Sequence, residues 1–398
     1  MFRTRGQGWA LLLLALAALG VWMVLNARWA RLPGGEDLAT LWASARVLLF
    51  VPEGDPYGPL AAAYAQRTAR AATPLPLLVP LYSLFPVFPL AWVRPFWVVR
   101  WIGLLAAQAA MGLALVLWPT LSRWRVRGPL LLIFVLSPVI WPFARWSLAR
   151  GGGSWLALLV WLLVFTFLRH RRDDLAGGAL ALLSLDPLPH ALAGLWVLVW
   201  AGSHGRWRVV RAFALTFAGL LLGAWWLRPH WWEGYLINVG REVIRGAWPQ
   251  FPTWFAERLP GVGTRAGWTA AGIGALLLLV EMARSWARED PHLAWVTALS
   301  LSLAPLLGVP LEPFSMGTLG LFVWWQVWSL WDKHWAYGRA VVAPMAGLWF
   351  GGMAWLAWQW GSDAAIPLAY LNAFVQVLAL YTVRDWALRA ESWSTWWI

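Results

Sequence analysis

Apolar runs recur along the whole chain and are separated by short polar segments. A helix needs about 20 apolar residues to cross a hydrocarbon core of ~30 Å, and most of the runs approach that length. Membrane-spanning helices are predicted at about 8–30, 96–118, 128–146, 155–168, 175–186, 188–202, 209–228, 266–286, 292–309, 315–331, 339–361 and 364–383. We therefore expect an all-α polytopic membrane protein of about 12 transmembrane helices, with residues 1–398 forming one domain.

Two segments are too polar to span and are predicted to be outer loops, 31–73 and 229–265. In the first, apolar residues recur at the helical spacing i, i+3, i+4, i+7, namely Leu38, Leu41, Trp42, Ala45, Leu48 and Leu49. This spacing predicts an amphipathic helix that lies on the membrane or on neighbouring helices. A second short helix is expected after Pro59.

The stretch 75–118 holds two apolar segments, 75–93 and 96–118, but the later charge pattern favours one net crossing. Two crossings would place the Arg123–Arg127 cluster outside and invert every later cluster. The first segment contains four prolines, Pro76, Pro80, Pro86 and Pro89, and Pro74 directly precedes it. It is therefore expected to be a half-depth or re-entrant element packed against protein.

Composition and charge strengthen the membrane assignment. Hydrophobic residues make up 61% of the 398 residues and charged residues 12%, against about 25% charged in a soluble domain, which excludes a water-soluble core. The net charge of +13 could suggest nucleic acid, but the basic residues sit in short clusters between apolar runs, as the positive-inside rule describes. The clusters are Arg123–Arg127, Arg169–Arg172, Arg206–Arg211, Arg284 with Arg288, Lys333–Arg339 and Arg384 with Arg389.

We place these clusters in the cytoplasm, together with the N-terminus and the C-terminus of a multi-pass cell-membrane protein. Residues 8–30 are expected to be an uncleaved first helix, because the apolar run is long for a secretory signal. Membrane lipids are expected partners and nucleic acid is not. The 38 tryptophans mostly fall near the ends of apolar runs, which suggests interfacial anchors. The chain has no cysteine, so thiolate chemistry and Cys-ligated metal sites are excluded.

The two predicted helices that flank Asp186-Pro187 are short, and such interrupted pairs often mark a binding site. Asp186 and His190 are ionisable groups inside this pair, where burial at membrane depth would be costly. If the junction opens to water, Asp186 caps the next helix instead. The two interpretations stay open.

Carboxylates also mark the first outer loop. Glu36 and Asp37 directly follow the first predicted span, where a carboxylate at the water–lipid boundary suits a general base. Asp37 could equally be the N-cap of the amphipathic helix, because Asp satisfies free helix N–H groups well. Asp55-Pro56-Tyr57-Gly58 is typical of a turn.

Two further patterns have simple explanations. Arg150-Gly151-Gly152-Gly153-Ser154 lies on the predicted outer side, where glycines permit either a close approach of backbone to a ligand or a flexible connection. Glu281 precedes Arg284 by three residues near a predicted cytoplasmic end. This spacing predicts a helix-surface ion pair without a functional role.

The first outer loop and the residues after it resemble glycosyltransferase family 87, a group of the GT-C superfamily. The resemblance lies in Asp37 with the Ala-rich helix through Ala45-Arg46, in Asp55-Pro56-Tyr57, and in Pro74-Leu-Pro76 leading into the apolar run Pro86–Trp97. It covers about residues 30–120, and beyond them only hydropathy and loop order. Members often carry Gly-Gln where this chain has Arg150-Gly151, and Lys-Pro where it has Asp186-Pro187.

The resemblance implies a GT-C-like helical bundle and an inverting transferase that moves a hexose, mannose above all, from a polyprenyl phosphate to a lipid or glycan acceptor at the outer face. Asp37 is the expected general base, without a cofactor and with no metal ligands assigned. The substrate-binding candidates are Glu36, Arg46, Asp55, Tyr57, Arg150, Asp186, His190, Arg241 and Arg245. A transporter or flippase of a lipid-linked substrate, and an inactive scaffold descended from such transferases, are the alternatives.

Overall fold

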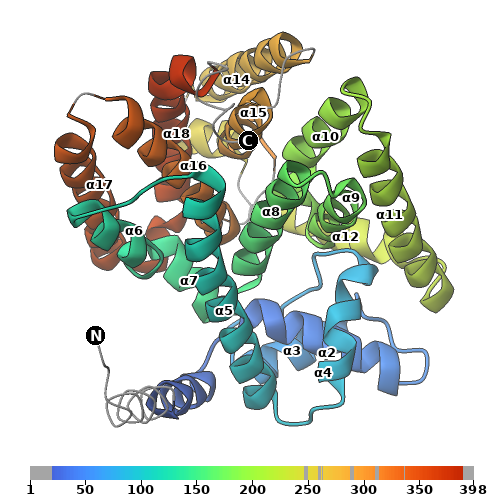
Figure 1. Cartoon of the computed structure of the whole chain (residues 1–398). Coiled ribbons are helices and arrows are strands. Elements are labelled where there is room, and N and C mark those ends of the chain that lie inside the picture. The colour runs from blue at the N-terminus through green and yellow to red at the C-terminus, as the bar shows by residue number, and fades with distance from the viewer. Residues whose placement is uncertain are drawn as a thin grey trace, which may run out of the picture.

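The chain folds into helices throughout the part that the structure describes, which is a computed structural model covering residues 20–245, 250–258, 261, 263–286, 291–309, 313–335 and 337–388 (Figure 1). Residues 20–30 form the first described helix. The predicted outer loops hold α2 (Glu36–Phe50), α3 (Pro59–Ala69), α12 (Trp231–Ile244) and α13 (Phe251–Arg258), and the predicted re-entrant segment holds η1 (Leu81–Val87) and α4 (Phe88–Ala91). The remaining helices are α5 (Phe96–Ser122), α6 (Pro129–Ile140), α7 (Pro142–Arg150), α8 (Gly153–Arg169), α9 (Asp173–Leu182), η2 (Leu183–Leu185), α10 (Pro187–Ser203), α11 (Trp207–Leu227), α14 (Gly263–Ser285), α15 (Pro291–Leu303), α16 (Pro313–His334), α17 (Gly338–Trp360), η3 (Gly361–Ala364) and α18 (Ala365–Leu388).

Six helices of the described chain are long and apolar enough to cross a membrane, which is the architecture of a multi-pass membrane protein. They are Phe96–Ser122, Pro129–Arg150, Trp207–Leu227, Gly263–Ser285, Ala340–Trp360 and Ala365–Leu388. The helices α8, α9, α10, α15 and α16 also fall where spans were predicted, and each differs from its predicted bounds by only a few residues. About 12 crossings remain a prediction.

The predicted outer segments lie at one end of α5, and the basic residues around Arg123, Arg169, Arg206 and Lys333 lie at the other, while Arg288 and Arg389 fall outside the described residues. The basic end is joined by hydrogen bonds between distant segments: Arg169 to the Leu121 carbonyl, Lys333 to the Ser122 carbonyl, Trp124 to Asp332, and Arg206 to Asp173. At the other end of α5, Phe96 packs against Trp42 of α2 with ring centroids 5.5 Å apart. This separation is what alternating topology requires, and which end faces the cytoplasm remains a prediction.

The first outer segment is a small packed unit at one end of the molecule, where α2, α3 and α4 lie side by side (Figure 1). Its own apolar cluster includes Trp42, Tyr57, Leu81 and Ala224. The Trp42 indole donates a hydrogen bond to the Leu90 carbonyl, and the Arg46 guanidinium donates one to the Ala91 carbonyl. The helix α2 is thus packed on neighbouring segments, as one of the two alternatives predicted, and its contact with the membrane remains a prediction.

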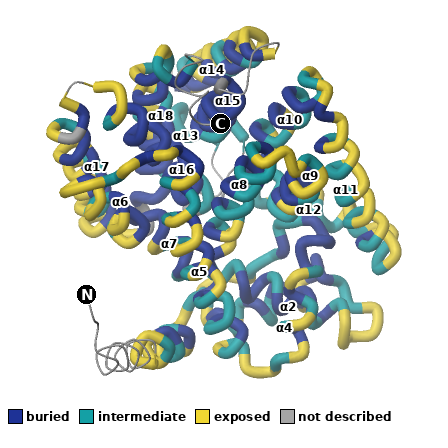
Figure 2. Tube along the Cα trace, viewed as in Figure 1, coloured by how far each residue is buried: buried dark blue, intermediate teal, exposed yellow. Residues whose placement is uncertain are grey.

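Tryptophans lie both inside the bundle and on its surface, so the prediction of interfacial anchors does not extend to all of them. Nine tryptophans are almost fully buried between helices, namely Trp42, Trp141, Trp155, Trp161, Trp196, Trp200, Trp295, Trp325 and Trp328. Figure 2 shows this buried interior inside an exposed surface of outward-facing helices. The reason is that indole buries a large apolar area and packs edge-on against other rings, which suits helix contacts as well as headgroups.

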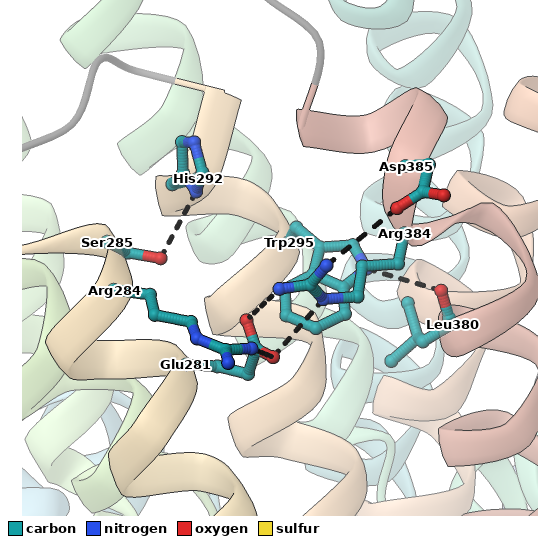
Figure 3. A network of polar contacts seen from close by, with 8 residues as sticks. All are labelled: Glu281, Arg284, Ser285, His292, Trp295, Leu380, Arg384 and Asp385. Carbon is teal, nitrogen blue, oxygen red and sulfur yellow. Dashed lines mark hydrogen bonds and ion pairs between the residues drawn. The ribbon is translucent and has the colours of Figure 1, made fainter.

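A buried ion pair joins α14 to α18 near the basic end (Figure 3). The Glu281 carboxylate is almost fully buried and accepts hydrogen bonds from Arg384 at 3.2 and 3.0 Å. The predicted pair with Arg284 is confirmed at 3.4 Å, but the Arg284 side chain is 60% exposed. Arg384 is therefore the main partner of Glu281, and sequence spacing could not show it.

Candidate active site at the outer-loop end of the bundle

Asp37 lies in the first turn of α2, at the end of the bundle that carries the outer segments. The N-cap is Gly35, which has a φ of 80°, and no side-chain capping hydrogen bond is present. The prediction of Asp37 as the N-cap is therefore wrong, because the helix already begins at Glu36 and Asp37 is its second residue. A carboxylate in the first turn still interacts favourably with the helix dipole, and its oxygens remain available to other partners.

That partner is Arg150, at the last residue of α7. The Arg150 Nη2 donates to Asp37 Oδ1 at 2.8 Å, and Nε donates to Oδ1 and Oδ2 at 3.2 and 3.3 Å. Both side chains are only partly buried, with 32% of Arg150 and 42% of Asp37 exposed. The pair is thus oriented by the protein and open to a ligand.

The glycines after Arg150 bring α7 against α2. Gly151 has a φ of 139°, and a Cβ there would come within 2.9 Å of the Leu38 backbone nitrogen. The close approach is therefore between two protein segments, and Gly151 fixes the position of Arg150 beside the first turn of α2. The helix α8 begins directly afterwards, at Gly153, so the predicted flexible connection is short.

Arg100 of α5 binds the segments next to Asp37 and Arg150, and it was not among the site residues predicted from the sequence. This buried arginine donates hydrogen bonds to the Leu32 carbonyl and, at 3.2 Å, to the Ala149 carbonyl. The Gly35 amide donates to the same Ala149 carbonyl at 2.9 Å. Arg100 thereby joins the segments that carry Asp37 and Arg150. An arginine inside a predicted span was the available signal.

Asp186 lies between η2 and α10, outside the six candidate spans, and faces the same site. Burial, and to a smaller extent the negative charge of Asp37, raise the pKa of this carboxyl to about 7. The negative charge of Asp37 thus acts on Asp186, and both α2 and the junction of the two short helices contact η1.

The junction that carries Asp186 is held by the segment after the first outer loop. The Ser83 hydroxyl donates to the Leu185 carbonyl, and a hydrogen bond joins the Tyr82 hydroxyl to the Ser184 side chain. Asp186 also helps to raise the pKa of Tyr235 in α12 to about 12, although burial is the larger cause. The second predicted outer segment contacts this region through Trp231 of α12, whose ring lies 5.7 Å from that of Tyr82.

Tyr57 joins the two outer segments. It follows the predicted turn, in which the Gly58 amide donates to the Asp55 carbonyl at 3.0 Å. The Tyr57 hydroxyl donates to the Val79 carbonyl at 3.0 Å, and Asn238 of α12 donates to the Tyr57 carbonyl at 3.1 Å. Tyr57 is buried, so its role is to hold the segments together.

Asp55 has a cation partner that sequence reasoning also missed. Arg228 Nη2 lies 3.5 Å from Asp55 Oδ1, and Nη1 donates to the Gly54 carbonyl at 2.9 Å. Arg228 was visible as a basic residue at the predicted outer end of a span, against the usual charge bias. The contact fixes the end of α11 to the first outer segment.

Several predicted site residues are placed elsewhere. The Arg46 guanidinium donates a hydrogen bond to the Ala91 carbonyl, and its Cζ lies 5.0 Å from the centroid of the Trp42 ring. His190 is buried and accepts a hydrogen bond from the Trp161 indole at 3.2 Å, as a core histidine does. Arg241 is exposed on α12, and Arg245 lies 3.2 Å from Glu242. Glu36 is half-buried and interacts electrostatically with Arg100.

Among the described residues, no group of three or more His, Asp or Glu side chains is arranged to hold a metal ion. No protein-family model, no curated protein and no solved structure matches the chain. The chemistry of the site therefore has to be inferred from Asp37, Arg150, Asp186 and their surroundings.

Proposed function

We propose that the protein is an inverting membrane glycosyltransferase that moves a hexose, mannose above all, from a polyprenyl-phosphate donor to a lipid or glycan acceptor. The observation that supports this best is the pairing of Asp37 with Arg150 beside Asp186, at the end of the bundle with the outer segments. A base for a hydroxyl and a cation for a phosphate are the two groups that such a transfer needs, and they lie in contact.

Asp37 is the proposed general base. The acceptor hydroxyl oxygen forms a bond to the anomeric carbon while the bond from that carbon to the phosphate oxygen breaks. The polyprenyl phosphate leaves with the bonding electrons, and the hydroxyl proton passes to Asp37. Positioned base catalysis of this kind is typically worth about 10² to 10⁴ in rate.

Arg150 is the proposed ligand of the donor phosphate. Its planar guanidinium suits phosphate oxygens as well as a carboxylate, and it is partly exposed where it meets Asp37. Arg150 would thus replace the lysine that members of the resembling family carry at the position of Asp186. A single Arg150 guanidinium in contact with both the Asp37 carboxylate and the donor phosphate would place the base close to the scissile bond.

Asp186 is compatible with a bound phosphate only in its neutral form. A pKa of about 7 keeps a large share of this carboxyl protonated near neutral pH. The protonated group can donate a hydrogen bond to a donor oxygen, whereas the ionised group would repel the phosphate.

The position of the broken helix pair bears on the transporter alternative. Carriers built from broken helices bind their substrate near the bilayer midplane. The junction at Asp186 is instead bound to the segment that follows the first predicted outer loop, through the hydrogen bond from Ser83 to the Leu185 carbonyl. The packed outer unit around α2 likewise favours an enzyme that works at one membrane face.

The experiment that tests the proposal uses the purified full-length protein in lipid nanodiscs. Radiolabelled polyprenyl-phosphate mannose and glucose are supplied separately with a membrane extract as the acceptor source. Transfer of label to an extracted product supports the enzyme. Donor movement between leaflets without product supports the carrier, and neither activity supports the inactive scaffold.

A further inference from the structure

The second outer segment contains an amphipathic helix whose two long faces meet different surroundings. The inner face of α12 carries Trp231, whose ring lies 5.7 Å from that of Tyr82 beside the Asp186 junction, and Asn238, which binds the Tyr57 and Leu77 carbonyls. Asn238 is the only buried residue of α12. Gly234 also packs closely on the Tyr57 ring. The helix is therefore attached along one side only.

The opposite side of α12 is apolar and exposed. It carries Trp232, Leu236, Ile237 and Ile244, and Ile244 is 87% exposed. At 100° per residue these four side chains fall within an arc of about 140°, the width expected of a face that lies on an apolar surface. Glu233 also lies on this side, in the first turn, where it is 3.2 Å from His230.

This face continues the exposed surface of the preceding helix. In α11 only Val209 and Ala224 are buried, so most of its apolar residues point outward (Figure 2). Trp225 and Trp226 lie at the end of α11, and Trp226 is 81% exposed. A spanning helix that ends in exposed indoles is typical of the lipid interface. Only three residues separate α11 from α12.

The charges of α12 match a phospholipid headgroup layer. Arg241 is exposed at one edge of the apolar face, Arg245 is exposed just after the last residue of α12, and Arg228 lies at the end of α11. Amphipathic helices with arginines beside an apolar face bind in the plane of the interface, with the apolar side at the boundary between headgroups and acyl chains.

We propose that α12 is an interfacial helix whose outer face lies in the headgroup layer of the membrane while its inner face lines the candidate site. A single helix then separates the bilayer from Asp186. This assignment concerns the membrane and holds whether or not the site transfers sugar. With the proposed function, it places the lipid-linked donor beside the site at the depth of its phosphate.

The test uses the absence of cysteine from the sequence. Single cysteines at Leu236 and Ile244 are spin-labelled in the full-length protein in nanodiscs that contain anionic phospholipid. Arg67 on α3 is the exposed control outside the proposed interface. Collisional access to oxygen, which concentrates in lipid, and to a water-soluble nickel chelate is measured for each label.

Labels at Leu236 and Ile244 are expected to be several-fold more accessible to oxygen than to the nickel chelate, and the label at Arg67 the reverse. Preference for the chelate at both α12 positions would overturn the assignment. So would low access to both reagents with dipolar broadening, which would show that a second copy of the chain covers the face.

Discussion

The guanidinium of Arg150 binds the carboxylate of Asp37 through three hydrogen bonds of 2.8 to 3.3 Å, although 113 residues separate them in the chain. Both side chains are partly exposed, and exposed ion pairs contribute only about 0 to 1 kcal/mol to stability. The pair is therefore a weak candidate for holding the fold. Its geometry instead orients a base beside a cation at the surface of the bundle.

Replacing Arg150 should impair transfer with little loss of stability. Arg150→Gln removes the charge, so we expect turnover to fall about 10²-fold, the typical effect of losing one donor that stabilises developing charge. Arg150→Lys keeps the charge without the planar fork and should fall in between. Arg145→Gln is the matched control, because Arg145 is exposed on the same helix α7. Equal turnover in the Arg145 and Arg150 variants would exclude Arg150 from the site.

Asp186 should make stability depend on pH. Its pKa is about 7 in the folded protein, so between the ordinary carboxyl pKa near 3.8 and pH 7 the folded state keeps a proton that the unfolded chain loses. The free energy of unfolding then falls as the pH rises through this window, and the loss is complete above pH 7.

Asp186→Asn removes this titration. Thermal unfolding of the wild type and of the variant, measured in the same nanodiscs from pH 4 to pH 8.5, should show a midpoint that falls more steeply with pH in the wild type. In the wild type, transfer should also slow as the pH rises and Asp186 ionises, because the ionised group repels the donor phosphate. This decrease should be weaker in Asp186→Asn. Parallel stability curves would contradict the raised pKa.

Glu281 should contribute to stability through Arg384. Glu281→Gln leaves the partly buried Arg384 guanidinium with only the exposed Asp385 carboxylate, 3.8 Å away, as an ionic partner, and losing a charged hydrogen-bond partner costs about 1 to 3 kcal/mol. Arg284→Gln is the control, since the exposed Arg284 should change the free energy of unfolding by less than about 1 kcal/mol. Chemical unfolding in mild detergent measures both. A larger effect at Arg284 would reverse the ranking.

The opposite placement of outer segments and basic clusters should be measurable in cells. Single cysteines at Arg67 and Thr253 are exposed at the outer-loop segments, and Arg172 is exposed at the basic end. An impermeant maleimide should label the first two in intact cells and the third only after permeabilisation. Labelling of Arg172→Cys in intact cells, with Arg67→Cys protected, would invert the topology. Ser44 is buried, so a cysteine at this position would not be accessible to the maleimide.

The sequence was a good guide to the helices because apolar length and turn chemistry act locally. The predicted helix after Pro59 is α3, and the interruption at Asp186-Pro187 separates η2 from α10. The turn at Asp55 is likewise present. Each of these features depends on a few consecutive residues, which is why the chain alone could predict them.

Long-range partners could not be predicted in this way. Arg100, Arg228 and Arg384 each bind groups that are distant in the chain, and nothing in local spacing indicates which carbonyl or carboxylate a side chain will reach. The same limit explains Arg46 and His190, which were predicted at the site and instead bind the Ala91 carbonyl and the Trp161 indole. Tertiary packing decides such contacts.

The most direct test of the central claim is the transfer rate of Asp37→Asn, compared with Asp174→Asn. Both aspartates are the second residue of a helix, in α2 and α9, so both changes remove the same helix-end charge, but α9 begins at the basic end of the bundle. With Asp37 as the base, Asp37→Asn should be folded and expressed normally while transfer falls by about 10² to 10⁴, and Asp174→Asn should retain full activity. Full transfer by a folded Asp37→Asn protein would contradict the assignment of Asp37 as the base.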